Sequence, residues 1–81
     1  MTNEEIRAIV IETLKGIAPE IEESDLRPDR PLRDQVDLDS MDWLNFLVGL
    51  HQRLQVDIPE ADYRKLTTLD TVIAYLAQKS V

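Results

Sequence analysis

Apolar residues recur at helical spacing in the first segment of the chain. The pattern predicts a helix that begins near Asn3 and closes at Gly16. Thr2 and Glu5, just at its start, have the spacing of a capping box, in which each residue's side chain bonds to the other's backbone. The apolar positions form one stripe on this helix, made of Ile6, Ile9, Val10, Leu14 and Ile17.

A second and more apolar helix is predicted from Ser40 to Leu54. Asp39 is suited to cap it, and Asp42 supports its first turn. Its apolar positions cover more than half of the circumference: Met41, Trp43, Leu44, Phe46, Leu47, Val48, Leu50 and Leu54. A helix with this pattern packs against several neighbours or carries a functional apolar face.

Two further helices are predicted near the end of the chain. Pro59 suits the first turn of a short helix over 60–65. The last helix starts at the pair Thr67-Thr68 and repeats apolar residues at 69, 72, 73, 76 and 77. No segment alternates as a strand would. We therefore predict an all-α fold, a small four-helix bundle of three longer helices and one short one, in a single domain spanning 1–81.

Residues 18–38 are predicted to form a long connection. Its three prolines, at 19, 28 and 31, rule out a long helix. A solvated loop of this length would be unusual in a small domain, so its apolar residues should hold it to the core, with one short turn near 32–36. These residues are Ile21, Leu26, Leu32, Val36 and Leu38.

The composition excludes several classes of function. Sixteen acidic and nine basic residues give a net charge of −7, which argues against nucleic-acid binding and against docking on an anionic membrane. Cysteine is absent, which removes disulfides, thiolate metal sites and a cysteine nucleophile. The N-terminus lacks a basic lead-in, and no apolar run could span a bilayer, so we expect a cytoplasmic protein.

The arrangements needed for catalysis are missing from the sequence. His51 is the only histidine, and a Ser-His-Asp site using Ser40 would place the two about 16 Å apart along one helix. The carboxylates do not form a calcium loop, and there is no glycine-rich phosphate loop. We interpret His51 as a partly exposed polar position and do not expect an enzyme.

Ser40 stands where the long connection becomes the most apolar helix. A helix N-terminus has unpaired N–H groups and about half a positive charge, so it suits a phosphate, either bound or esterified to the serine. The alternative is that Ser40 is simply a residue suited to a first helical turn. The spacing alone leaves both interpretations open.

The segment Asp39-Ser40-Met41 resembles the attachment motif of acyl carrier proteins and related peptidyl carrier domains. The resemblance covers essentially the whole chain and is specific. It includes Pro31-Leu32, the run Asp37-Leu38-Asp39-Ser40-Met41-Asp42, the leucines at 44, 47, 50 and 54, the turn Val56-Asp57-Ile58-Pro59, and Leu66-Thr67-Thr68-Leu69.

This resemblance implies a carrier in which a phosphopantetheinyl transferase attaches 4′-phosphopantetheine covalently to Ser40. Acyl cargo would then travel as a thioester between a loading ligase or transferase and downstream acyl-processing enzymes. The protein would act as a monomer. A chain without cysteine agrees with a thiol supplied by the arm. Aminoacyl or peptidyl cargo, an unmodified helical interaction domain, and a hydrolase using Ser40 are the alternatives.

The resemblance also assigns roles to residues around Ser40. Asp39 would cap the helix and help the transferase hold its metal and coenzyme. Met41 and Leu44 would lie near the arm and contact partner enzymes; the alternative is that these two side chains pack in the core. The partner-docking face would contain Asp42, Asn45, Val48, Gly49 and Gln52. The groove of the arm would be bordered by Ile58, Glu60, Asp62 and Tyr63; for Glu60 and Asp62 a solvated face is the alternative.

The chain departs from the family pattern in charge. Residues 40–56 are neutral, whereas residues 1–39 carry −6 and residues 57–81 carry −1. Asp37 replaces a glycine common in the family. We therefore hypothesise a specialised freestanding carrier whose partners make more apolar contact, through Trp43 or Val48. A long acyl cargo would need a cavity, lined by Leu32, Leu50, Ile58 and Leu66 with Tyr63 at its mouth.

Overall fold

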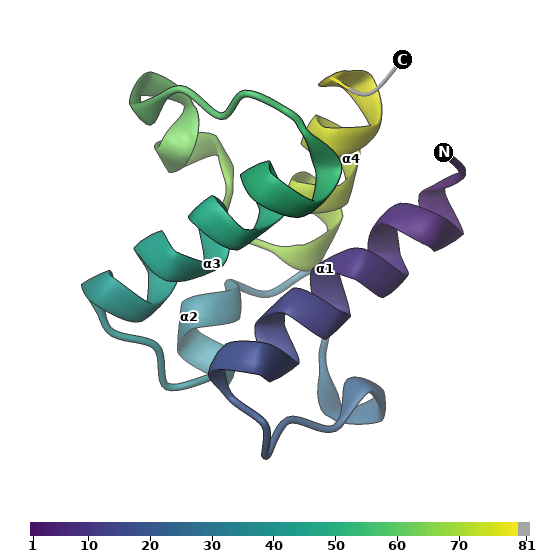
Figure 1. Cartoon of the computed structure of the whole chain (residues 1–81). Helices are drawn as coiled ribbons and strands as arrows, with labels where there is room; N and C mark the ends of the chain where they lie inside the picture. Colours follow the sequence, from purple (N-terminus) through teal and green to yellow (C-terminus); the bar gives the residue numbers. More distant parts are fainter. Residues whose placement is uncertain (80–81) are drawn as a thin grey trace.

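A computed structural model describes residues 1–79 as a bundle of helices (Figure 1). Its elements are α1 (Asn3–Ile17), η1 (Glu23–Asp25), α2 (Leu32–Gln35), α3 (Ser40–Leu54), η2 (Glu60–Lys65) and α4 (Leu69–Lys79). Over residues 1–79 there is no strand, and one isolated β-bridge joins Pro31 to Thr68. The predicted all-α class is confirmed, with three long helices. None of the helices in this part of the chain is long and apolar enough to cross a membrane.

Helix α1 begins with the predicted capping box. The Glu5 N–H donates to Thr2 Oγ1 at 3.2 Å, and the Thr2 N–H donates to Glu5 Oε1 at 2.9 Å. The helix passes Gly16 and ends at Ile17, so its predicted end was one residue early. Because α1 contacts both α3 and α4, its buried face is wider than the predicted stripe. Ile11 is buried, while Ile9 and Ile17 are half-buried.

The connection between α1 and α3 is held to the core as predicted. Leu26, Leu32, Val36 and Leu38 are buried, Ile21 is half-buried, and α2 forms the expected short turn. The single turn η1 was not predicted. The side chain of Gln35 closes the connection, since it accepts from the Arg27 N–H at 2.6 Å and donates to the carbonyls of Arg27 and Arg30 at 2.7 and 2.9 Å.

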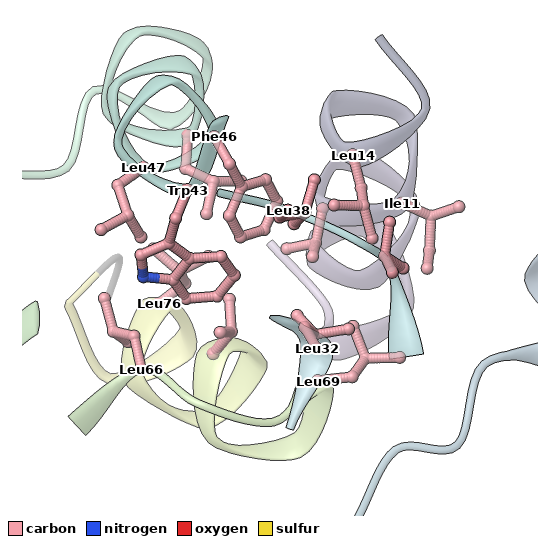
Figure 2. Packing of buried hydrophobic residues seen from close by; sticks show 14 of the residues in the cluster. Ile11, Leu14, Leu32, Leu38, Trp43, Phe46, Leu47, Leu66, Leu69 and Leu76 are labelled. Carbon is pink, nitrogen blue, oxygen red and sulfur yellow. The ribbon is translucent and has the colours of Figure 1, made fainter. Parts of the chain in front are cut away.

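The core is one apolar cluster to which the long helices and the connection contribute (Figure 2). From α3 it receives Trp43, Phe46, Leu47 and Leu50, which share one face of the helix. Trp43 is only 8% exposed, and its ring packs against Phe46 with centroids 5.1 Å apart. Our hypothesis that Trp43 offers an apolar surface to partners is therefore wrong, because its ring completes the core.

Two short features end α3 and lead into α4. Gln55, the residue after Leu54, adopts a left-handed backbone conformation with φ 55°, so α3 ends at Leu54. Pro59 then precedes η2, in agreement with the predicted short helix over 60–65. Thr68 Oγ1 accepts from the Thr71 N–H at 3.0 Å, so this threonine opens α4 at the predicted place.

Candidate functional site

The first turn of α3 is organised by Asp39. Its backbone is extended, its Oδ1 accepts from the Asp42 N–H at 2.8 Å, and its carbonyl accepts from the Trp43 N–H at 3.0 Å. The predicted capping role of Asp39 is confirmed. The amides of Ser40 and Met41 have no partner among residues 1–79, so two backbone donors remain available at this helix end.

Ser40 is the first residue of α3 and is exposed. Its hydroxyl makes no hydrogen bond within the described part of the chain. Because Asp39 caps the helix, the fold does not need this hydroxyl. A phosphate ester on it would point into solvent beside the two available amides and the positive end of the helix dipole. The local structure therefore fits an esterified phosphate.

Next to Ser40, α3 exposes an apolar stripe, which we define as Met41, Leu44 and Val48. These side chains are 65%, 41% and 42% exposed. In residues 1–79 the only other large hydrophobic side chain exposed to this degree is Met1. The alternative that Met41 and Leu44 pack in the core is therefore wrong. Patches of this kind on a monomer's surface mark contact sites for other molecules.

The predicted docking residues divide into two groups. Asn45 and Gln52 are exposed on α3, and Asp42 is half-buried in its first turn. Gly49 instead faces α1, where a Cβ atom added to it would meet Thr13 Cγ2 at 2.8 Å. The placement of Gly49 on the docking face is therefore wrong, since this glycine permits the close approach of α1 and α3.

A groove of about 380 Å³ runs beside the apolar stripe between α3 and η2. Val48, Ile58 and Tyr63 line it, as do His51 and Asp57 at its polar edge. The His51 ring is partly exposed, as predicted, with Nδ1 2.7 Å from the Val56 carbonyl and 4.0 Å from Asp57 Oδ1. Glu60 is exposed and, like Asp62, does not line the groove.

The four residues named for a long-chain cavity do not share one. Leu32, Leu50 and Leu66 are 0–2% exposed and belong to the packed core, while Ile58 lines the groove. Leu66 also borders a smaller pocket that contains Tyr63 and Trp43. Trp43 of α3 and Tyr63 of η2 thus line this smaller pocket.

Asp62 ties η2 to α4. Its Oδ2 accepts from the Tyr75 hydroxyl at 2.6 Å, and its Oδ1 lies 3.4 Å from Lys65 Nζ. The hydrogen bond from Tyr75 lowers the pKa of Asp62. Burial first, and the bond to Asp62 second, raise the pKa of Tyr75 to about 12, so its hydroxyl stays protonated at neutral pH. This contact between distant segments could not be read from the sequence pattern.

The described residues hold no group of three or more histidine, cysteine, aspartate or glutamate side chains that could bind a metal ion. The arrangement at α3 is thus an exposed hydroxyl at a capped helix start, next to exposed apolar side chains and a groove. Such an arrangement can accept and present a covalently attached group.

Comparison with known proteins agrees with this chemistry. Residues 4–76 match the family described as "Phosphopantetheine attachment site", so the chain belongs to that family. Its relatives place it among the acyl carrier proteins, and its cofactor is 4′-phosphopantetheine. Its function is that of an acyl carrier, as the resemblance at 39–41 predicted.

The relatives span most or all of the chain. The acyl carrier protein of Helicobacter hepaticus is 24% identical over 75 residues, which are 93% of this chain and 92% of that protein. The meromycolate extension acyl carrier protein of Mycobacterium tuberculosis is 32% identical over 76 residues, 94% of this chain and 65% of that protein. A solution structure from Anaplasma phagocytophilum, described as an acyl carrier protein, has a TM-score of 0.86 at 31% identity and covers 100% of this chain and 94% of its own.

Proposed function

We propose that Ser40 is the residue that carries the arm. The observation that supports this proposal is its exposed hydroxyl, which makes no hydrogen bond within residues 1–79, at a helix start that Asp39 already caps. In the transfer step the Ser40 oxygen would lose its proton and bond to the phosphorus that carries pantetheine in coenzyme A. The pyrophosphate bond of coenzyme A would break, and its nucleotide half would leave as adenosine 3′,5′-bisphosphate. The attached arm supplies a thiol on which cargo forms a thioester.

Several other hydroxyl groups in the described residues are less suited to this role. Those of Thr2, Thr13, Thr68 and Thr71 take part in hydrogen bonds that shape helices. Ser24 is exposed, but it lies in the single turn η1 between Glu23 and Asp25, whose charges would repel a phosphate. Ser40, in contrast, is the first residue of a helix of 15 residues.

The helix end is expected to orient the arm only weakly. An anion at an exposed helix N-terminus is stabilised by about 0.3–1 kcal/mol. The neighbouring carboxylates of Asp37, Asp39 and Asp42 oppose this effect by repulsion. The arm should therefore swing freely and reach several enzymes, as a carrier requires. We also propose that Asp39 helps the transferase hold its metal and coenzyme, in addition to capping α3.

The partners are expected to recognise the apolar stripe and the polar residues beside it. Since α3 carries one acid, Asp42, and one base, Arg53, electrostatic steering toward it should be weak. The proposed partners are the transferase, an acyl- or aminoacyl-loading enzyme and downstream acyl-processing enzymes. We propose a specialised freestanding carrier, and full replacement of a housekeeping carrier in reconstituted fatty-acid synthesis would contradict this specialisation.

The remaining proposals describe the protein as a whole. We propose that it forms one carrier domain over 1–81, acts as a monomer in the cytoplasm, and performs no catalysis itself. The separation of Ser40 from His51, 11 residues along α3 and so about 16 Å, supports the last point because the only histidine of the chain lies out of reach of the hydroxyl.

Intact-mass measurement tests the attachment site. The protein is incubated with coenzyme A and a phosphopantetheinyl transferase of broad specificity. We expect one added phosphopantetheine in the parent protein and in Ser24→Ala, the control at the other exposed serine of residues 1–79, and none in Ser40→Ala. Unchanged modification of Ser40→Ala, or loss in Ser24→Ala instead, would refute the assignment. Circular dichroism should show both variants folded, because neither hydroxyl forms a hydrogen bond within residues 1–79.

A further inference from the structure

A second pocket lies next to the start of α3 and has an unusual charge for this protein. It has a volume of about 200 Å³, and we name it the arginine pocket after two of its lining residues, Arg33 of α2 and Arg64 of η2. Trp43, Tyr63 and Leu66 supply its apolar surface. Although the chain carries −7, the described residues that line this pocket include two bases and no acid.

The two arginines are not neutralised by the fold. Within residues 1–79 neither side chain forms an ion pair or a hydrogen bond, whereas Arg7 and Arg53 pair with glutamates of other elements. The carboxylate of Asp62, two residues before Arg64, is occupied by Tyr75 and Lys65. Both arginines are exposed, and each therefore keeps an unpaired positive charge beside the pocket.

The indole N–H of Trp43 adds a neutral donor to this charge. Figure 2 shows the indole nitrogen on the side of the ring that faces Leu66, away from Phe46. This N–H has no hydrogen-bond partner within the described part of the chain, although Trp43 is only 8% exposed. An indole N–H can only donate. Although the ring is largely buried, its nitrogen is not sealed from solvent, since residues 1–79 hold no buried side-chain nitrogen or oxygen without a partner. The N–H is thus accessible to a ligand that accepts hydrogen bonds.

The position of the pocket relates it to the arm. Trp43 follows Ser40 by three residues, so it lies one helical turn, about 4.5 Å, along the same helix. An arm on Ser40 could thus return its end to this pocket. The volume is below the roughly 300–1,000 Å³ typical of pockets for larger ligands, and two aromatic rings border it. It suits a short group and not a long acyl chain.

We infer that the arginine pocket binds the terminal carboxylate of a short dicarboxylic acyl group carried on the arm. Guanidinium groups match carboxylate oxygens in geometry and charge, and they keep their charge at every physiological pH. This inference rests on the proposed attachment at Ser40 and names the class of cargo for that same site.

The experiment uses Trp43 as its own reporter, because it is the only tryptophan in the chain. Apo protein labelled with nitrogen-15 is loaded from butyryl-coenzyme A or succinyl-coenzyme A by a transferase of broad specificity. The two cargoes have four carbons and differ only in a terminal methyl or carboxylate. We expect the indole ¹H–¹⁵N signal to move downfield with succinyl cargo and to stay at its holo position with butyryl cargo.

Substitutions assign the shift to the pocket. The downfield shift of the indole signal should be smaller in Arg33→Gln and in Arg64→Gln. The controls are Arg27→Gln and Arg30→Gln, whose arginines line a different surface hollow, and they should leave the shift unchanged. Equal indole signals with both cargoes would overturn the inference. A shift from the apo to the holo protein, before any cargo is loaded, would also overturn it, because the arm itself would then occupy the pocket. Intact-mass measurement separates this inference from the proposed attachment at Ser40. If the arm is loaded but the indole signal does not shift, only the inference about the pocket is refuted. If no arm is attached to Ser40, both are refuted.

Discussion

Helices α1 and α3 are built alike but differ on their outer faces. Each has 15 residues, each starts at a side-chain cap, and the two pack against each other (Figure 1). On α1 the isoleucine, valine and leucine side chains are buried or half-buried. On α3 the apolar stripe remains exposed, and a serine with an unused hydroxyl precedes it.

This difference separates what folding needs from what function needs. Helix α1 shows that the bundle can be built from a helix whose large apolar side chains are at least half covered. Exposed apolar surface loses the stabilisation of about 25 cal/mol per Å² that burial provides. We therefore propose that the stripe on α3 serves contact with other molecules, and it starts beside the proposed attachment residue.

The largest expected change in stability distinguishes the buried face of α3 from its exposed face. Phe46 is fully buried, so Phe46→Ala should lower the free energy of unfolding by about 3–5 kcal/mol. Leu44→Ala, two residues earlier on the exposed face, should change it by no more than about 0.5 kcal/mol. Urea denaturation at neutral pH measures both, and Phe46→Leu provides a milder variant if Phe46→Ala does not fold. A large loss in Leu44→Ala would show that the stripe belongs to the core.

The two glycines of the chain test the contact between the helices. Gly49→Ala should destabilise the protein by about 1–3 kcal/mol, because the new Cβ meets Thr13 Cγ2, and Thr13 is held by its bond to the Ile9 carbonyl at 2.7 Å. Gly16→Ala, with nothing within 4 Å, should stabilise α1 by about 0.4–1 kcal/mol. Thermal unfolding of the two variants should shift in opposite directions; shifts of the same sign would contradict the close approach.

The two caps should contribute similarly to stability but differ in function. Thr2→Ala and Asp39→Ala should each lower the free energy of unfolding by about 1 kcal/mol. Asp39→Asn keeps an oxygen acceptor for the Asp42 N–H, so its stability should return toward that of the parent. If Asp39 also serves the transferase, the rate of arm attachment should stay low in Asp39→Asn and be normal in Thr2→Ala. Normal rates in both would restrict Asp39 to capping.

The smallest effect concerns pH and the cap of α1. The Thr2 backbone N–H, and secondly its side chain, lower the pKa of Glu5 in the folded protein. A carboxyl with a lowered folded pKa stabilises the fold above its unfolded pKa, and this contribution is lost as pH falls through the folded value. The stability difference between the parent and Glu5→Gln should therefore be present at pH 7 and shrink toward pH 3. A difference independent of pH would contradict the capping box.

The sequence was sufficient to predict helix ends where a cap or a helix-breaking residue decides them locally. The capping box at Thr2, the cap at Asp39 and the break near Pro59 are decided within a few residues, and α3 has its predicted ends. The left-handed residue Gln55 that ends α3 was not predicted. Because apolar residues cover more than half of the circumference of α3, the pattern could not show which of them face solvent. Trp43 and Gly49 were therefore misplaced, since their burial depends on Phe46 and on Thr13 of another helix.

Contacts between segments distant in sequence were also beyond the pattern. The bond from Tyr75 to Asp62 joins residues 13 apart, and the Gln35 side chain binds backbone groups up to eight residues away. Neither contact leaves a periodic signal. At the candidate site, the sequence predicted Ser40 as the attachment residue and Asp39 as the cap of α3. The arginine pocket is lined by residues of α2, α3 and η2, so it appears only in the folded chain.

The central claim is that Ser40 bears the arm in the mature protein. Its most direct test is top-down mass spectrometry of the protein purified from the cells that make it, with fragmentation that locates the modified residue. The account predicts a single phosphopantetheine, with or without cargo, on the fragment containing Ser40. An unmodified protein, or an arm located on another residue, would contradict it.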